Sequence, residues 1–537
     1  MGRPSIDCAI NDKIRQPAIP SLPSGKRWHT PACDVWRVVG SFCLVTATCS
    51  AMRPLAKAKL LAVSILISYA CNFQYGYSSV YLNTPIDSFK AYLNESLVRR
   101  GWDMTESTYS WMWNLILNIW FVGFFFGVWI SPFLNDRYGR KVGFIVMNIL
   151  SLVAAIARYL ATQFYVPELL FAGRIMVSVA TAVTYQSQIL YLQECSPTKL
   201  RGFLTFFSEI SFATMCLLGM FLGTKSIFGD HINYLLGVVV IPCALFVIAL
   251  FPIPETPKFL LIVKCDKVAA TKSIQFFQGA DADVDSVLDE IAKEAEGDAE
   301  AKSSLKEIFT TPYLRQAVIL SCLTLQNTVA LWSLLLSSTF FLTDVNLNES
   351  VAQWSSTSMA MCYTVGTICG AVCIERFGRR NMVITFASLN SLTLVLYVIL
   401  AAIHKSVSWA NYGCLVCLLM YGYTYGCGVG PISWFLSSEL VPQRHRSLVQ
   451  SLCYAINTLM VVITTFTVLP LYNVIGAYAF IPLYIIPSTC SLIYLFMYLP
   501  ETKSREIHEI VNELKGKKAP KQIGRVYPVP PDYPPSF

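Results

Sequence analysis

The residues of this sequence best suited to chemistry are acids and arginines in three short motifs, each of which occurs twice. Carboxylates and guanidinium groups beside apolar segments form ion pairs, because an unpaired charge is costly there. No nucleophile with an adjacent base, no metal-ligand spacing and no nucleotide-binding glycine loop accompanies them, so we expect neither an enzyme nor a metal or other cofactor. The motifs are D-R-Y-G-R-K at 136–141 and E-R-F-G-R-R at 375–380, E-x-x-P-x-x-x-R at 194–201 and 439–446, and P-E-T at 254–256 and 500–502.

The motifs recur in the same order, at offsets of 239, 245 and 246 residues. Three ordered pairs at a nearly constant offset indicate that one half of the chain is a duplicate of the other. Parallel repeats of this kind are one of the known plans of membrane transporters, in which the solute binds near the middle of the membrane between the two halves. The duplication therefore predicts a site between the halves.

The segments that position these motifs are apolar. Hydrophobic residues make up 54% of the chain and charged residues only 14%, against about 25% charged in soluble domains. Twelve apolar runs can each cross a hydrocarbon core about 30 Å thick as a helix, and none alternates as a barrel strand would. We expect an all-α membrane protein with twelve transmembrane helices in two six-helix, pseudo-symmetric halves. The runs lie near 58–82, 111–134, 142–162, 166–193, 201–224, 233–253, 313–342, 352–374, 381–403, 409–438, 446–471 and 474–499.

Lysine and arginine cluster after the second, fourth, eighth and tenth runs. Positive charge stays on the cytoplasmic side, which places both termini and loop 254–312 in the cytoplasm, in a protein expected in the plasma membrane. The N-x-Ser sites at Asn94 and Asn348 then lie outside and are candidates for glycosylation. The net charge of +8 follows the same bias, so nucleic acid is not an expected partner.

The sequence divides into five parts. An apolar patch at 36–52 fits a signal anchor or an interfacial helix. We expect it to belong to a cytoplasmic, peripheral or poorly ordered segment and leave it outside the helix count. Segment 283–296 has apolar residues at helical spacing and predicts an amphipathic helix. The parts are a basic N-terminal cytoplasmic segment (1–57), a six-helix bundle (58–253), a cytoplasmic linker with amphipathic helices (254–312), a second six-helix bundle (313–499) and a cytoplasmic tail (500–537).

Further motifs accompany the charged ones: Q-Y-G-Y at 74–77, Gly173-Arg174, P-E-T-P-K-F-L-L at 254–261 and G-P-I-S-W-F at 430–435. With these motifs the sequence resembles the sugar porter family of the major facilitator superfamily, and within it the animal facilitative hexose transporters. The resemblance covers roughly 58–510. It implies a carrier in the lipid bilayer that moves a hexose or a similar small polar solute by alternating access, as a facilitative uniporter without a cofactor.

The resemblance also implies that the charged motifs pair at the cytoplasmic ends of the helices and gate the carrier. Glu194 and Glu439 would meet arginines of the 136–141 and 375–380 motifs when the cytoplasmic side is closed, and separate when it opens. The alternative is that the charges only set topology and anchor helix ends. The expected gating residues are Asp136, Arg140, Glu194, Arg201, Glu255, Glu375, Arg379, Arg380, Glu439, Arg446 and Glu501.

Five residues stand at family substrate positions: Gln326, Trp434, Asn457, Glu209 and Tyr363. The amide groups that pair with sugar hydroxyls are depleted, because Leu325, Leu331 and Tyr363 replace amides of the family pattern. The resemblance therefore leaves the identity of the solute open, and these losses also fit a transport-dead sensor or scaffold.

Glu209 stands where the family has a glutamine. A carboxylate in the middle of a membrane is a functional candidate by default. It could bind solute hydroxyls, a cationic group or a coupling proton, or it could pair with a neighbour and have no role in transport. A proton-coupled carrier of another small organic solute is the corresponding alternative function.

Overall fold

The computed structural model describes most of the chain, and the elements in this part are helices. The apolar patch 36–52 and the tail beyond 515 lie outside the described residues, as do the side chains of Arg201 and Glu375. The described ranges are 54–102, 105–197, 200–279, 283–296, 304–404, 406–407, 409–503, 505 and 507–515.

Twelve helical spans in the described residues are long and apolar enough to cross a membrane. This confirms the predicted number, and each span coincides with one predicted run. The first half contains α2 (Pro54–Val80), α4 (Glu106–Tyr138), α5 (Arg140–Phe164), α6 (Pro167–Cys195), α7 (Arg201–Leu222), and α8 (Ile232–Gly237) continued by α9 (Val240–Leu250). The second contains α14 (Pro312–Gln326) with α15 (Val329–Asp344), α16 (Glu349–Phe377), α17 (Arg379–Ile403), α18 (Ala410–Thr424) with η2 (Tyr425–Val429) and α19 (Gly430–Glu439), α20 (Gln443–Ile475), and η4 (Ile481–Ile485) with α21 (Ile486–Tyr498).

Two spans of the second half are broken near their middle. The seventh is interrupted between α14 and α15, and Ser337 inside α15 has a non-helical φ of −140°. The tenth changes to a π-helix, η2, before α19. Pro431, near the start of α19, has no N–H to bond the carbonyl of Cys427, so the turn before it widens. Backbone groups freed in this way inside a membrane must face protein or a cavity.

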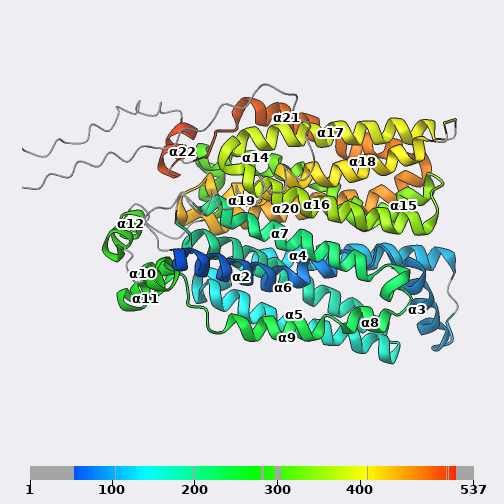
Figure 1. The fold of residues 1–537 in the computed structure, drawn as a ribbon, viewed down its shortest axis with the longest axis horizontal. Coiled ribbons are helices and arrows are strands. Elements are labelled where there is room, and N and C mark those ends of the chain that lie inside the picture. The colour runs from blue at the N-terminus through cyan, green and yellow to red at the C-terminus, as the bar shows by residue number, and fades with distance from the viewer. Residues whose placement is uncertain are drawn as a thin grey trace, which may run out of the picture.

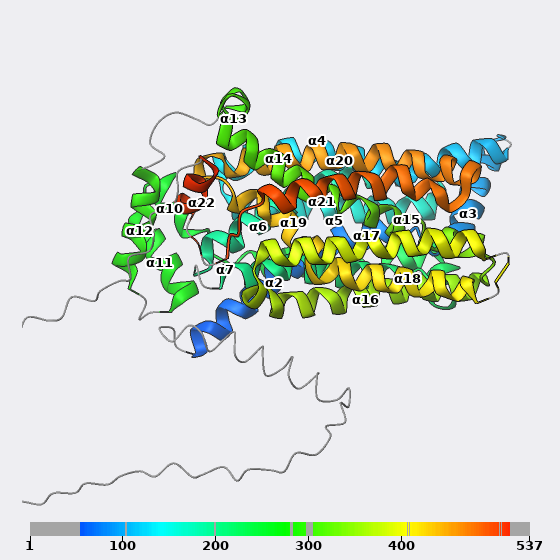
Figure 2. The same ribbon diagram turned by 90° about the horizontal axis from the view of Figure 1, so that it is seen from above.

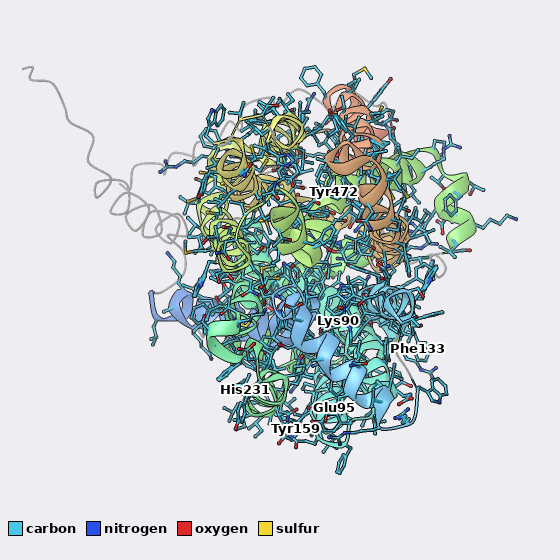
Figure 3. All side chains as sticks on the ribbon, turned by 90° about the vertical axis from the view of Figure 1, so that its right-hand side faces the viewer. Lys90, Glu95, Phe133, Tyr159, His231 and Tyr472 are labelled. Atoms are coloured by element: carbon cyan, nitrogen blue, oxygen red, sulfur yellow. The ribbon has the colours of Figure 1, made fainter. Side chains whose placement is uncertain are left out.

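The two halves form two layers that lie side by side. The blue-to-green helices α2–α9 make one layer and the yellow-to-red helices α16–α21 belong to the other (Figure 1). Between the layers α7 packs along α16 and α4 along α20. Seen from one end, the groups remain separate, with Lys90 and His231 in the first half and Tyr472 in the second (Figure 3). The seam between the halves is where the duplication predicts the site.

The two ends of the bundle carry different short helices. One end, here termed the linker end, carries α10 (Pro257–Ile262), α11 (Lys267–Gln278), α12 (Val284–Glu296), α13 (Leu305–Thr310) and α22 (Ile507–Leu514) (Figure 2). The opposite end, the α3 end, carries α3 (Ile86–Val98) and η1 (Lys225–Gly229), and η3 (Gly476–Ala479) precedes the last span. The amphipathic helix predicted at 283–296 is α12, whose Leu288 packs with Ala270 and Ile274 of α11.

Glycines let α16 lie directly against the broken tenth span. A Cβ on Gly366 would lie 2.3 Å from the carbonyl oxygen of Tyr423, and one on Gly370 would lie 2.2 Å from that of Cys427. Neither distance leaves room for a side chain, because the obstructing atoms are backbone. This close approach holds η2 beside Tyr363 of α16.

Candidate solute site and the ion pairs at the linker end

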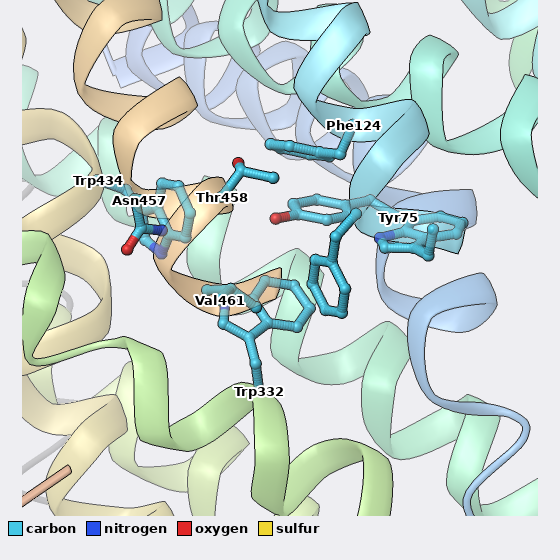
Figure 4. A pocket seen from close by; sticks show the side chains of 9 residues that line it. Tyr75, Phe124, Trp332, Trp434, Asn457, Thr458 and Val461 are labelled. Carbon is cyan, nitrogen blue, oxygen red and sulfur yellow. The ribbon is translucent and has the colours of Figure 1, made fainter. Parts of the chain in front are cut away.

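A small pocket lies between the halves. Its volume is about 10 Å³, which is room for about one water molecule. Trp434 and Asn457 face Tyr75 and Phe124 across it, and Trp332 closes a further side (Figure 4). The lining is formed by Tyr75, Trp120, Phe121 and Phe124 of the first half and by Trp332, Trp434, Asn457, Thr458 and Val461 of the second.

Tyr75 connects the aromatic rings of the lining. Its ring centroid lies 5.4 Å from that of Phe124 and 6.0 Å from that of Trp332, so the contact crosses from one half to the other. Trp332 in turn meets Phe121 edge-on at 5.4 Å. Because six of the nine lining residues are aromatic, the walls offer π faces on which a ring or a cation packs.

Polar groups in the lining are few. The side-chain oxygen of Asn457 is buried and has no hydrogen-bond partner among the described residues. Buried polar atoms are normally bonded, so this oxygen is a ready acceptor for a solute donor. Thr458 follows it on α20, and its hydroxyl already donates to the carbonyl of Tyr454 at 2.7 Å. The pocket therefore holds a solute mainly by its aromatic walls.

The structure brings together four of the five expected solute residues. Trp434 and Asn457 line the pocket. Glu209 and Tyr363 contact each other close behind it, since the Tyr363 hydroxyl donates to Glu209 Oε1. Gln326 is the last residue of α14 and is not among the lining residues.

The sequence reasoning missed most of the lining: Tyr75, Trp120, Phe121, Phe124, Trp332, Thr458 and Val461. Tyr75 belongs to the Q-Y-G-Y motif, which could have identified it. Trp332 lines the pocket because the helix breaks after Gln326. No feature of the sequence predicts this break.

Glu209 is buried, with 2% of its surface exposed. Its second oxygen, Oε2, accepts a hydrogen bond of 3.3 Å from the Tyr185 hydroxyl. The Tyr185 ring lies 5.1 Å from Tyr75 and 5.6 Å from Trp434, both of which line the pocket. The carboxylate is thus one ring behind the pocket wall, and through Tyr363 it joins α7 of one half to α16 of the other.

At the linker end of the first half, Glu194 is fully enclosed. Its Oε1 lies 3.1 Å from Nε and 2.9 Å from Nη2 of Arg140, and its Oε2 accepts the Thr256 hydroxyl at 2.6 Å. Glu255 accepts the backbone N–H of Lys141 at 2.9 Å. Burial raises the pKa of Glu255, although the N–H groups of Thr256 and Lys141 oppose the shift. All three motifs therefore meet at one point.

The second half repeats this arrangement with looser contacts. Arg379 Nε lies 3.8 Å from Glu439 Oε2, which accepts the Thr502 hydroxyl at 2.6 Å. Glu501 accepts the backbone N–H of Arg379 at 2.8 Å and that of Arg380 at 3.2 Å. The duplicated sequence motifs are thus duplicated structures.

The remaining expected gating residues have different surroundings. Arg380 donates to the carbonyl of Phe496 at 2.7 Å. Arg446 is buried at the start of α20. Asp136 is exposed near the C-terminal end of α4. The expectations for Arg201 and Glu375 concern side chains outside the described part. The ion pairs Arg140–Glu194 and Arg379–Glu439 each lie within one half, so they do not themselves join the halves.

Neutral hydrogen bonds join the halves at the linker end. The amide of Gln193 on α6 donates to Ser438 Oγ on α19 at 2.8 Å. Ser451 Oγ on α20 donates to Gln186 Oε1 on α6 at 3.2 Å. These two contacts close the seam between the halves on this side.

The α3 end is closed as well. Lys225 Nζ lies 2.6 Å from Glu349 of the second half and 2.8 Å from Asp87 of its own half. Hydrogen bonds to these carboxylates raise the pKa of Lys225, so its charge is retained at every pH below the usual lysine value. Neutral bonds add to this closure: Asn83 Nδ2 to Ser338 Oγ at 2.9 Å and Gln353 Nε2 to the Thr84 carbonyl at 3.3 Å.

Comparison with known proteins identifies the family to which this chain belongs. A family model described as "Sugar (and other) transporter" matches residues 63–514. The chain belongs to this sugar transporter family. The match confirms the family resemblance read from the motifs, and the family is one of transporters and not a class of enzymes.

Curated relatives of this transporter are members of solute carrier family 2. Facilitated glucose transporter member 5 of Homo sapiens is 28% identical over 487 residues, which are 87% of this chain and 94% of that protein. Member 7 of Mus musculus is 25% identical over 460 residues, with 84% and 89% covered. Member 11 of Homo sapiens is 25% identical over 480 residues, with 88% and 96% covered.

Solved structures agree on the major facilitator fold. The proton:xylose symporter XylE bound to 6-bromo-6-deoxy-D-glucose superposes with a TM-score of 0.72 at 15% identity, covering 84% of this chain and 98% of that one. The inward open form of XylE from E. coli gives 0.63 at 18% identity, with 84% and 99% covered. The predicted fold class is confirmed.

The unequal burial of the two ion pairs predicts unequal costs of breaking them. Glu194→Gln leaves Arg140 buried without its carboxylate, which costs about 3–5 kcal/mol for a buried pair. Glu439→Gln removes a longer contact, at 3.8 Å, and costs less. We expect Glu194→Gln to lower the melting temperature of the purified protein clearly more than Glu439→Gln does. Equal shifts, or the reverse order, would contradict the assignment.

Proposed function

We propose that this protein is a transmembrane carrier that moves a hexose or a similar small polar solute by alternating access, as a facilitative uniporter. The observation that supports this most is the aromatic pocket between the halves, with hydrogen bonds closing it at both ends. A pocket closed toward both ends fits a carrier between its two open states. It holds about one water molecule, so on this proposal it widens for the solute as one end opens. A channel would show a continuous passage instead.

The contacts across the seam suit a reversible opening. A neutral hydrogen bond stabilises by only about 0.5–1.5 kcal/mol, and a partly exposed ion pair by about 0–1 kcal/mol. Either end can therefore open for a few kcal/mol, which keeps both open states populated. Within each half the buried Arg–Glu pairs are stronger than these contacts. On this proposal the pairs hold the helix ends of each half in the position that allows the linker end to close. They therefore affect opening and closing indirectly.

Trp434 and Asn457 are proposed to contact the solute directly. Trp434 supplies an aromatic face and the unpartnered oxygen of Asn457 accepts a hydrogen bond. Tyr363 and Glu209 would act from behind the wall. Gln326 reaches the solute only if the broken seventh span turns during opening.

We propose that the linker end and both termini are cytoplasmic and that the protein lies in the plasma membrane. The sites Asn94 and Asn348 are then extracellular, and both are exposed at the α3 end. Asn348 caps α16 by accepting the N–H of Ser350 through its oxygen at 3.2 Å. This leaves its nitrogen available for a glycan.

A second candidate function is proton-coupled transport. Glu209 favours it, because a buried carboxylate between the halves can exchange a proton with each side in turn.

Counterflow into proteoliposomes tests the leading proposal. Vesicles preloaded with a hexose that the carrier accepts should take up the labelled sugar transiently above equilibrium, since the carrier exchanges solute without an energy source. The panel includes hexoses, pentoses, polyols and small organic solutes. Absence of flux for the whole panel, with a folded protein, would favour the sensor or scaffold.

An inward proton gradient across the proteoliposome membrane tests whether solute uptake is coupled to protons. A uniporter takes up solute at the same rate with and without the gradient and does not accumulate it. Accumulation that the gradient drives, and that Glu209→Gln abolishes, would establish the second candidate in its place.

The Lys225 bridge predicts how the α3 end opens. Lys225→Met removes up to about 1 kcal/mol of closure, so Ser338→Cys behind it should react up to about fivefold faster with an impermeant maleimide on intact cells. Lys90→Met is the matched control, because Lys90 pairs with Glu106 within the first half. Equal reactivity in both backgrounds would show that the bridge does not close this end.

A further inference from the structure

Glu209 has no positively charged partner in the part of the chain that the structure describes. The groups that act on it are the hydroxyls of Tyr185 and Tyr363, with Tyr75, Tyr425 and Cys216 nearby. No lysine, arginine or histidine among the described residues pairs with it. A buried carboxylate is costly unless a proton or a cation neutralises it. No described basic side chain therefore balances the Glu209 carboxylate by direct contact.

The hydrogen bonds around Glu209 fit both its ionised and its protonated form. One tyrosine hydroxyl donates to each carboxylate oxygen, Tyr363 to Oε1 and Tyr185 to Oε2. An ionised carboxylate accepts both bonds, whereas a protonated one donates one of them to a tyrosine oxygen, which can also accept. Both forms therefore fit these contacts. Whether a proton or a cation neutralises Glu209 depends on the other groups around it.

The wall between Glu209 and the pocket is aromatic. Tyr185 contacts Tyr75 and Trp434 with its ring while its hydroxyl holds the carboxylate. Aromatic faces attract cations, most strongly where water is excluded, and cages of such rings bind ammonium groups. A carboxylate behind an aromatic wall strengthens this attraction.

The same lining is poorly suited to a neutral sugar. Asn457 is the one amide among the nine lining residues, and the unpartnered Nε1 of Trp120 is a further donor. These few polar groups leave several hydroxyls of a hexose without a partner. The free oxygen of Asn457 accepts an N–H⁺ donor as readily as a hydroxyl.

Other buried charges indicate where in the pocket a cation would sit. The Arg174 guanidinium lies 5.6 Å from the Trp120 ring, on the first-half wall. Arg158, also fully buried, donates to Ser78 and Gln74 of α2. Both repel a cation from the Trp120 side. The Tyr185 and Trp434 side, next to Glu209, is the favourable one.

We propose that the solute of this carrier bears a cationic nitrogen on a small polar body, and that Glu209 is its counter-charge. The inference rests on the proposed carrier function and narrows its substrate class. An amino sugar and a small quaternary or primary amine share this chemistry. Tyr185 and Trp434 contact the cation, and Glu209 stabilises it through Tyr185 or directly once the wall moves.

Matched pairs of solutes test the charge. In proteoliposomes at pH 6.5 counterflow is measured for D-glucosamine against D-glucose and N-acetyl-D-glucosamine, and for choline against its neutral carbon analogue 3,3-dimethylbutan-1-ol. We expect at least one cationic member to exchange about tenfold faster or more than its neutral partners. The pair that shows the preference distinguishes an amino sugar from a simple amine.

Two variants test whether Glu209 causes the preference for the cationic solute. Glu209→Gln, which restores the amide of the family pattern, should abolish the preference for the cationic member. Glu106→Gln removes a carboxylate that is 83% exposed at the α3 end and should leave the preference unchanged. Equal loss in both variants would show that the protein's overall charge, and not the site, selects cations.

The outcomes separate this inference from the carrier proposal. Exchange of neutral hexoses at least as fast as glucosamine, with no change in Glu209→Gln, would overturn the inference and leave the carrier standing. Where no solute exchanges, melting temperatures decide: stabilisation by glucosamine or choline in the parent but not in Glu209→Gln supports the cation site while overturning the carrier. No stabilisation by any member overturns both.

Discussion

The account depends on one constraint: inside a bilayer, every backbone N–H and C=O must be bonded within the protein. Unbroken helices meet it by themselves, so a broken helix is tolerated only where its free groups face protein. Besides the sixth span, which is interrupted between α8 and α9, the chain breaks its seventh and tenth spans, the corresponding first and fourth helices of its second half. These two breaks face the seam. Trp332 follows the first break and Trp434 the second. Each break thus positions one of the two tryptophans of the second half that line the pocket.

A second regularity is the distribution of strong and weak contacts. Each half is braced internally by a buried Arg–Glu pair together with a threonine and a second glutamate, in the same arrangement at Glu194 and Glu439. Among the described residues, the contacts between the halves are neutral hydrogen bonds, the bond from Tyr363 to Glu209, ring contacts and the Lys225 bridge. Rigid halves with a weak seam are what a rocking movement requires, because opening then breaks seam contacts and leaves the halves intact.

The sequence was sufficient for the fold because its signals are local or repeated. Apolar length predicts a span, and the run 111–134 differs from α4 (Glu106–Tyr138) only where capping at Thr105 and the charged D-R-Y turn extend the helix beyond the apolar core. The duplicated motifs predicted which acids lie near which arginines, as found for Glu194 with Arg140 and for Glu439 with Arg379. They could not show that each pair remains within one half.

The pocket was predictable only in part, because its lining depends on how each helix is rotated and where it breaks. Trp434 and Asn457 came from motif positions. Gln326 was expected beside them, yet α14 ends at that residue and the chain turns, so Trp332 lines the pocket in its place. Glu209 stood out by its charge alone, but its two tyrosine partners come from α6 and α16, and no spacing in the sequence brings these helices together.

The central claim is that two rigid halves rock about this pocket, opening one end as the other closes. Distances between spin labels at two positions per end test it most directly: Ser226 with Ser350 at the α3 end, and Tyr138 with Phe377 at the linker end, all exposed. In lipid the account predicts two populations, one with the α3-end distance long and the linker-end distance short, the other reversed, with proportions that shift on adding a transported solute. Distances that lengthen together at both ends, or that stay single and unchanged, would contradict it.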